Sequence, residues 1–376
     1  MKKNKRKIIT IIASFLIIVL IAISLIYFNT QENNVEIKSS LKEYNAELQE
    51  NEHMHLEVDS SGDKVPVPNG YVGSKVAGEN EIDTGYVIYE GTDEVNDSNV
   101  EEAQKTRNQY VWIPVPDAST MYGTDENGKK WGKLYDFTTD TGDDIDPITG
   151  TKPLNWSESG GVITILDKNS CREPDIIKNS REIAYDTNSR LKSLEIGLES
   201  SHEFLNQLEK EFNSIIESMK KYGGFYIGRY ETGDLSKDKV SVTKGNKDIH
   251  SETWYTMYKK CNELRNENAN VGTGLIWGSQ WDRTLIWLME TGNKTKEEIC
   301  SSNSGSNIKQ ATGLNESTKA NNIYDLIGNY TEYTMESYGE GKRAYRGLNN
   351  VADDTTNIYA ISINDSVGCR AMLYIK

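Results

Sequence analysis

Cysteine and histidine are both scarce in this sequence of 376 residues, with four of each. The cysteines lie far apart, so the chain has no C-x-x-C pair and no Cys/His spacing typical of a zinc site. A domain of this size does not need disulfide bonds to fold. The spacing therefore excludes the zinc-finger class, and it leaves open whether the thiols pair or stay free. The four positions are Cys171, Cys261, Cys300 and Cys369.

Motifs that bind phosphates or activate a serine nucleophile are absent as well. No G-x-G-x-x-G occurs, and GTGLIWGS, residues 272–279, lacks the Lys and Ser/Thr of a phosphate-binding loop. No elbow motif anchors a Ser/His/Asp arrangement. The four histidines, at positions 53, 55, 202 and 250, are too scattered to favour a three-His iron site.

One long apolar run, residues 8–28, breaks an otherwise polar chain and contains no charge, Gly or Pro. At about 1.5 Å per residue it spans roughly 30 Å, the thickness of the hydrocarbon core of a bilayer. Five cations precede the run and none follows it before Lys38, so the N-terminus is predicted to be cytoplasmic and the rest extracellular. A cleaved signal peptide is the alternative, but the following IYFNTQENN offers no small-x-small cleavage site. We therefore expect a single-pass signal anchor in the cell membrane, with residues 1–7 as a basic cytoplasmic tail.

The part after the anchor is strongly acidic. Taking the five N-terminal cations from the 42 Lys and Arg leaves 37, against 57 Asp and Glu, a net charge of −20. Such a charge repels nucleic acid and anionic lipid headgroups, so we expect no nucleic-acid partner. It suits cations, neutral glycans or basic partners, and solubility alone explains it equally well.

Hydrophobic periodicity and turn residues divide the remaining chain. Residues 29–64 are polar and are predicted to form a stalk, and residues 65–376 a domain with a divergent insertion around 120–195. Apolar residues at helical spacing predict helices within 198–219, 251–264 and 274–293. Short runs bounded by Gly, Asp and Pro predict strands, which gives an α+β class with short strands and long loops. The expected strands are 84–91, 109–116, 225–233, around 329–335, around 343–347, and 368–375.

Three of the seven Trp fall close together in the third of these helical segments, at Trp277, Trp281 and Trp287. They could form a platform on which a sugar stacks. Their helical spacing favours packing in the core instead.

Four segments resemble, in order, the hallmarks of the sulfatase-modifying-factor family, that of the formylglycine-generating enzymes. They are GGFYIGRYETG, GLIWGSQWDRTLIW, IYDLIGNYTEYT and YRGLNN…DSVGCR. The third is the most specific, although Thr331 and Tyr333 replace the two Trp of the family pattern. The resemblance covers roughly residues 65–376. The matching positions are Trp281, Asp325, Leu326, Gly328, Asn329, Glu332, Thr334, Arg346, Gly347, Gly368 and Arg370.

The resemblance implies a fold similar to C-type lectin domains, with small twisted sheets and few helices. That fold carries enzymes, sugar binders and display proteins, so function depends on the site. The family's oxidase chemistry uses two cysteines that bind copper(I), expected here near Ala352 and Asn357, and neither position is Cys. No copper is therefore expected, and formylglycine generation is not predicted.

The resemblance also implies a use for the Gly328–Asn329 loop. In similar proteins, loop carbonyls with an Asn and a Glu side chain hold calcium, and here Gly328, Asn329, Tyr330 and Glu332 would be the ligands. The alternative is structural. In that case Glu332 pairs with a buried Arg370 or Arg346, and Asn329 adopts a left-handed backbone conformation.

Together these features predict a membrane-anchored extracytoplasmic binding or display module that is not catalytic. Its ligand would be an extracellular glycan, a peptide or a surface protein. The alternatives are a divergent enzyme of the same family, acting on an exported protein or a small molecule, and a structural part of an envelope or secretion assembly.

Overall fold

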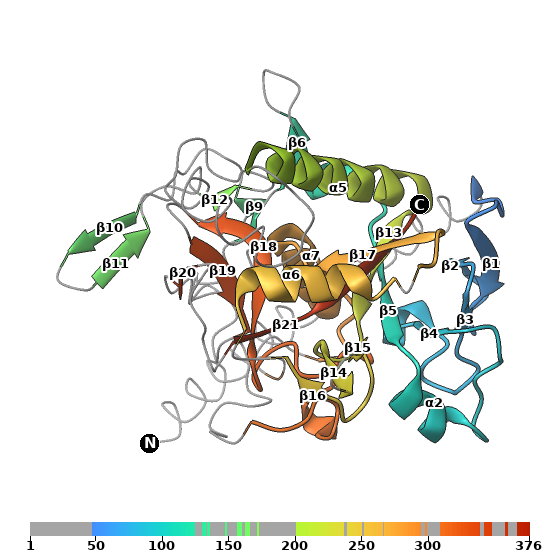
Figure 1. Cartoon of the computed structure of the whole chain (residues 1–376). Coiled ribbons are helices and arrows are strands. Elements are labelled where there is room, and N and C mark those ends of the chain that lie inside the picture. Colours follow the sequence, from blue (N-terminus) through green and yellow to red (C-terminus); the bar gives the residue numbers. More distant parts are fainter. Residues whose placement is uncertain are drawn as a thin grey trace, which may run out of the picture. The chain divides into compact units, whose positions relative to one another are not determined.

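The computed structural model describes a compact unit, Leu48–Lys376, that follows a second unit, Met1–Glu47 (Figure 1). The expected tail, the anchor and the first half of the stalk, residues 1–46, lie outside the described residues. Within the described part of the chain, no helix is long and apolar enough to cross a membrane. The described residues are 47–124, 130–132, 134–135, 147–148, 156–159, 162–165, 171–172, 201–236, 239–249, 252–265, 267–294, 298, 309–338, 342–347, 358–359 and 367–376.

Short strands and few helices make up this unit, which confirms the mixed α+β class. The longest helix, α5, ends at Gly223, whose φ of 77° is the left-handed conformation that stops a helix. Short 3-10 turns occur at Ile82–Thr84, Ala118–Thr120 and Glu316–Thr318. The described α-helices are α2 (Val100–Thr106), α5 (Ser201–Tyr222), α6 (Trp254–Glu263) and α7 (Gly278–Glu290).

A six-stranded antiparallel sheet, ordered β17-β22-β13-β5-β4-β3, forms the larger framework. Every residue of its four strands β17, β22, β13 and β5 is buried, so these strands are covered on both faces. The bounds are β3 Tyr71–Gly73, β4 Val87–Glu90, β5 Gln109–Pro114, β13 Gly224–Gly228, β17 Val271–Leu275 and β22 Ala371–Ile375.

A second sheet of five strands carries the motif segment. Its central strand β18 pairs antiparallel with β12 and β19 and parallel with β21, and β20 extends it beyond β19. The bounds are β12 Cys171–Arg172, β18 Thr331–Tyr338, β19 Lys342–Arg346, β20 Ile358–Tyr359 and β21 Val367–Cys369.

The end of the chain differs from the expectation of one strand over 368–375. The structure has two strands there, because the chain leaves the second sheet after Cys369 and enters the first at Ala371. Arg370 is the single residue between them. It therefore lies where the two sheets meet.

Small hairpins and a three-stranded sheet complete the fold. The strands β6 and β7 form one of these antiparallel pairs. The bounds are β6 Tyr122–Thr124, β7 Lys130–Gly132, β8 Leu134–Tyr135, β9 Pro147–Ile148, β10 Trp156–Ser159, β11 Val162–Ile165, β14 Gly233–Ser236, β15 Lys239–Ser241 and β16 Lys247–Asp248.

The domain begins before residue 65, the start expected from the sequence. The strand β1 (Met54–Val58) pairs antiparallel with β2 (Lys64–Pro68), so residues 48–64 belong to the compact unit and not to the stalk. Glu57 holds this hairpin to the framework by bonding Lys75 Nζ at 2.6 Å and the amide of Gly73 at 2.7 Å. The strand escaped detection because only Met54 of its five residues is buried.

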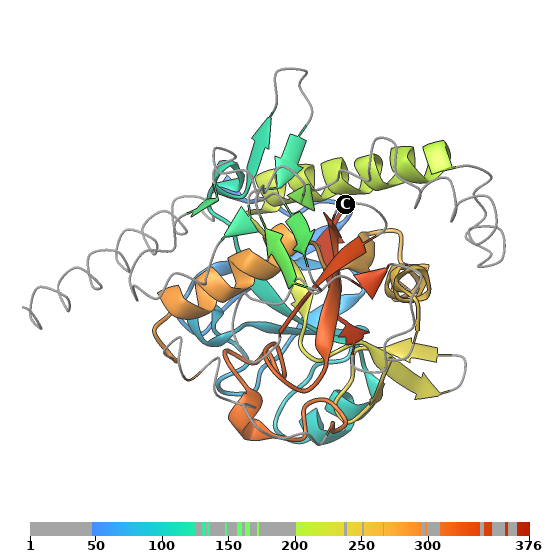
Figure 2. The ribbon, with the colours of Figure 1, turned by 90° about the vertical axis from the view of Figure 1, so that its left-hand side faces the viewer.

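Helices flank the two larger sheets. α6 contacts β17 and α7 contacts β5 and β18, and the two helices lie on opposite sides of these strands (Figure 2). Trp277, Trp281 and Trp287 are all at most 3% exposed. The core interpretation of these three residues is therefore confirmed, and they form no surface platform.

Candidate functional site

The motif loop before β18 has an unusual backbone. Asn321, Asn322, Asp325 and Asn329 have positive φ angles of 43°, 63°, 57° and 55°. Asn and Asp tolerate this left-handed conformation better than other non-Gly residues, which explains their repeated use in residues 321–329. The expectation of a left-handed Asn329 is confirmed.

Side chains of the loop fix it to neighbouring segments. Asn322 Nδ2 donates to the carbonyl oxygens of Gly78 at 2.5 Å, Thr84 at 3.1 Å and Gly85 at 2.8 Å. Asp325 Oδ2 accepts from Thr312 Oγ1 at 3.0 Å and from the Gly313 amide at 2.8 Å. Asp325 is thus a turn-holding residue in this structure, since its carboxylate oxygen is bound within the fold.

Glu332 and Arg370 form a buried ion pair at the meeting point of the sheets. Glu332 Oε1 lies 2.7 Å from Arg370 Nε and 2.6 Å from Nη2, and neither side chain is exposed. Arg370 also donates to the carbonyls of Gly228 and Tyr324, each at 2.8 Å. Burial raises the pKa of Glu332, and the charge of Arg370 acts against that rise. Of the two arginines considered from the sequence, Arg370 is the partner of Glu332.

Arg346 makes a separate buried cluster on β19. Its guanidinium lies 2.9 Å from Glu336 Oε2 and 3.4 Å from Asp282 Oδ1, and it lies over the ring of Trp281. The following Gly347 has a φ of 94°, and a Cβ there would lie 2.9 Å from the Leu326 carbonyl oxygen. Arg346 is therefore explained by its buried ion pairs, and Gly347 by a backbone conformation and a close contact that disfavour a side chain.

The four residues predicted to hold calcium do not form an oxygen cage as they lie here. Asn329 Nδ2 donates to Glu231 Oε2 at 2.5 Å, and the Tyr330 amide donates to Glu231 Oε1 at 3.1 Å. Glu332 faces Arg370 instead. Among the residues described, no group of three or more His, Cys, Asp or Glu side chains is placed to hold a metal ion. The calcium site stays a prediction, and we derive no chemistry through it.

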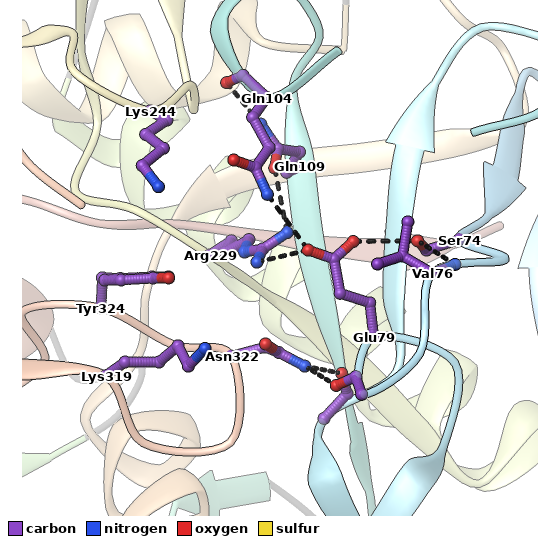
Figure 3. A network of polar contacts seen from close by, with 12 residues as sticks. Ser74, Val76, Glu79, Gln104, Gln109, Arg229, Lys244, Lys319, Asn322 and Tyr324 are labelled. Carbon is purple, nitrogen blue, oxygen red and sulfur yellow. Dashed lines mark hydrogen bonds and ion pairs between the residues drawn. The ribbon is translucent and has the colours of Figure 1, made fainter. Parts of the chain in front are cut away.

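A third buried arginine, Arg229, follows β13 and forms the centre of the network in Figure 3. Arg229 Nη2 lies 2.7 Å from Glu79 Oε1, and Nη1 donates to Tyr89 at 3.0 Å and to Gln109 Oε1 at 3.2 Å. Its side chain is only 2% exposed. The guanidinium charge is therefore neutralised within the fold.

Glu79 is the acceptor for most of this network. It accepts from Ser74 Oγ at 2.9 Å and from Gln104 Nε2 at 3.1 Å (Figure 3). It also accepts from the Tyr89 hydroxyl at 2.9 Å. Burial opposes its ionisation, but the charge and hydrogen bonds of Arg229 hold the pKa of Glu79 below its usual value. Sequence reasoning missed Glu79, because it lies in a polar loop and no local pattern links it to a residue 150 positions away.

Tyr324 joins this network to the Glu332–Arg370 pair. Its amide donates to the Arg229 carbonyl at 2.9 Å, while its own carbonyl accepts from Arg370. Its ring stacks on Tyr230 with the centroids 5.2 Å apart. The two buried ion pairs are thus coupled through one residue of the motif.

The outer side of Tyr324 carries a surface cluster that we call the Lys–Glu patch, made of Lys244, Lys319 and Glu316. Both lysine Nζ atoms lie 5.8 Å from the Tyr324 ring centroid. Glu316 accepts from the Tyr324 hydroxyl at 2.8 Å and pairs with Lys319 at 3.2 Å and Lys244 at 3.6 Å. The side chains are 26% exposed for Lys244, 38% for Lys319 and 62% for Glu316, so solvent reaches them.

The copper-binding cysteine pair of the formylglycine-generating enzymes has no counterpart among the described residues that follow Arg346 and Gly347. The positions of the copper-binding pair, 352 and 357, lie outside the described residues, as do the side chains of Tyr338 and Tyr359. Tyr345 is buried against Tyr333. The thiols of Cys261 and Cys369 are buried and free, with their sulfurs 3.9 Å apart.

None of the family models, curated proteins or solved structures compared with this chain matches it. The family resemblance therefore rests on the sequence motifs alone.

Proposed function

We propose that this protein is a membrane-anchored extracytoplasmic binding or display module whose domain resembles formylglycine-generating enzymes but is not catalytic. The main support for the proposal is that the charged residues of the motif are buried and paired with opposite charges. Glu332, Arg346 and Arg370 are 0%, 7% and 0% exposed, and each is paired with an opposite charge.

A catalytic acid, base or nucleophile has to reach a substrate atom within hydrogen-bonding distance. Buried charges that neutralise one another cannot do this without breaking a pair, which is strongly unfavourable. The motif is better suited to hold loops and sheets in position. The short sheets, few helices and returning C-terminal strand of the described residues support a C-type-lectin-like arrangement for the domain expected over residues 65–376.

We assign ligand contact to the Lys–Glu patch. It combines exposed charges of both signs with a rigid base, because Tyr324 is fixed by Arg229 and Arg370. Rigid aromatic support with adaptable polar groups suits recognition of a polar glycan or peptide. The acidic charge of the whole chain adds a bias toward neutral or basic partners.

Binding by the purified full chain in detergent, on glycan and peptide arrays, tests this assignment. The double variant K244A/K319A should lose at least tenfold in affinity for whichever array ligand binds. The control K259A removes a lysine of similar exposure, 36%, from an ion pair on α6 and should bind normally. Equal binding by all three proteins would remove the patch from the proposal, and turnover of a bound ligand would refute the non-catalytic reading.

The anchor is tested in intact cells expressing the full chain. We expect external protease to degrade the domain, and the undigested protein to stay in membranes after alkaline extraction. A domain released into the medium would instead indicate a cleaved signal peptide, and a protected domain would contradict export. The divergent-enzyme alternative rests on the fold resemblance alone.

A further inference from the structure

Two cysteines far apart in sequence meet in the core of the domain. Cys261 on α6 and Cys369 at the end of β21 are 108 positions apart, and their sulfur atoms lie 3.9 Å from each other. Neither residue is exposed. The sequence alone could not pair them, because four cysteines allow three connectivities.

We propose that Cys261 and Cys369 form a disulfide bond in the mature protein. An S–S bond is about 2.0 Å long, so the two sulfurs have to approach by only about 2 Å. Within the described residues no acidic or histidine side chain joins them in a metal-ligand group. The location predicted for the domain is outside the cell, where disulfides form and persist. The inference rests on the proposed export for its cellular setting.

The chemistry is thiol–disulfide exchange with a small-molecule or protein disulfide as the oxidant. One cysteine thiolate attacks a sulfur of the oxidant, which forms a mixed disulfide and releases one oxidant thiol. The second cysteine thiolate then attacks the protein sulfur of the mixed disulfide and releases the other oxidant thiol. The two cysteines lose two electrons and two protons, and the oxidant disulfide is reduced to two thiols.

The geometry also sets when the bond forms. In the folded reduced protein both thiols are closed off from an oxidant. The hydrogen bond with the Cys261 thiol, together with burial, raises the pKa of Cys369. Few thiolates are then available to react. The bond therefore forms during folding, before the helix covers the strand, and the native reduced protein resists oxidation.

A disulfide here would fasten α6 to the residue next to Arg370. Cys369 immediately precedes Arg370, the residue between the two large sheets. Closing a loop of this length restricts the unfolded chain and stabilises the folded one. The bond would thus reinforce the crossing point from which Arg370 reaches Glu332.

The test is a peptide map without reduction, after free thiols have been alkylated. The full chain is refolded in detergent with reduced and oxidised glutathione. We expect a cross-linked peptide pair containing Cys261 and Cys369. Quantitative alkylation of Cys261 and Cys369, or a link from either one to Cys171 or Cys300, would overturn the inference.

Two further readouts make the result specific. Oxidised glutathione added to the native reduced protein should leave the pair unlinked, whereas rapid linkage there would contradict the buried geometry. Reduction, or the C261A/C369A double variant, should lower the melting temperature by roughly 5–10 °C relative to the C171A/C300A control. Refolding in vitro does not depend on where the protein lies in the cell. An intracellular domain would therefore contradict the proposed function, whereas the disulfide could still be tested by refolding.

Discussion

Removing Arg370 is the change with the largest predicted effect on stability. Its guanidinium makes two contacts shorter than 2.8 Å with Glu332 and donates to two backbone carbonyls, all in a site with no exposure. Breaking a buried ion pair by removing one partner destabilises a protein by about 3–5 kcal/mol. A domain is typically stable by only about 5–15 kcal/mol, so R370M should lose a large fraction of the total.

Urea unfolding of the full chain in detergent, followed by Trp fluorescence, measures this loss. R370M and E332Q should each be destabilised by about 3–5 kcal/mol, and R370M/E332Q by clearly less than the sum. The control E263Q breaks an exposed pair between Lys259 and Glu263 on α6 and should change stability by less than about 1 kcal/mol. Additive effects, or a loss below about 1 kcal/mol in R370M, would refute the reasoning.

The same variant has a pH signature. Without Arg370, burial raises the pKa of Glu332 further, above its unfolded value, so the folded state binds a proton more tightly than the unfolded state. Stability of R370M relative to the parent should therefore rise as the pH falls from 7 to 5. A constant difference over that range would mean that Glu332 is not buried as described.

Three smaller predictions use the same unfolding assay. Hydrogen bonds to the Glu57 carboxylate lower its pKa to about 2 despite burial. The contribution of Glu57 to the free energy of unfolding is therefore present above about pH 5 and is lost toward pH 2. E57Q should make stability less dependent on pH over this range. N322A leaves three carbonyls without their donor and should cost roughly 2–3 kcal/mol, whereas an unchanged midpoint would contradict those bonds. G85A would place a Cβ 1.9 Å from the Asn321 carbonyl oxygen and should destabilise more than G62A, which has a similar positive φ but open space.

Local periodicity was sufficient to predict α5, α6, α7 and most strands of the framework, whereas the short helix α2 was not predicted. The apolar spacing from Phe204 to Met219 describes the buried face of α5, and the Gly223–Gly224 pair its end. Asn329 was correctly expected in a left-handed backbone conformation. The structural role considered for Glu332 was also available from the sequence, as one of two alternatives.

Features that depend on contacts between distant segments were not predictable in this way. The chain crosses between sheets at Arg370, but the run from 368 to 375 is apolar on both sides and gives no sign of a break. Glu79 and Arg229 form a pair only because β13 and a polar loop meet in three dimensions. The strand β1 has too few buried apolar residues to show a period of two.

Metal analysis of the purified full chain tests the central claim most directly, because the proposed binding module has no redox centre. We predict less than about one tenth of an equivalent of copper or iron per chain, and calcium content is compatible with the same fold. One equivalent of copper or iron, retained after dialysis against a weak chelator, would contradict the account and identify an enzyme.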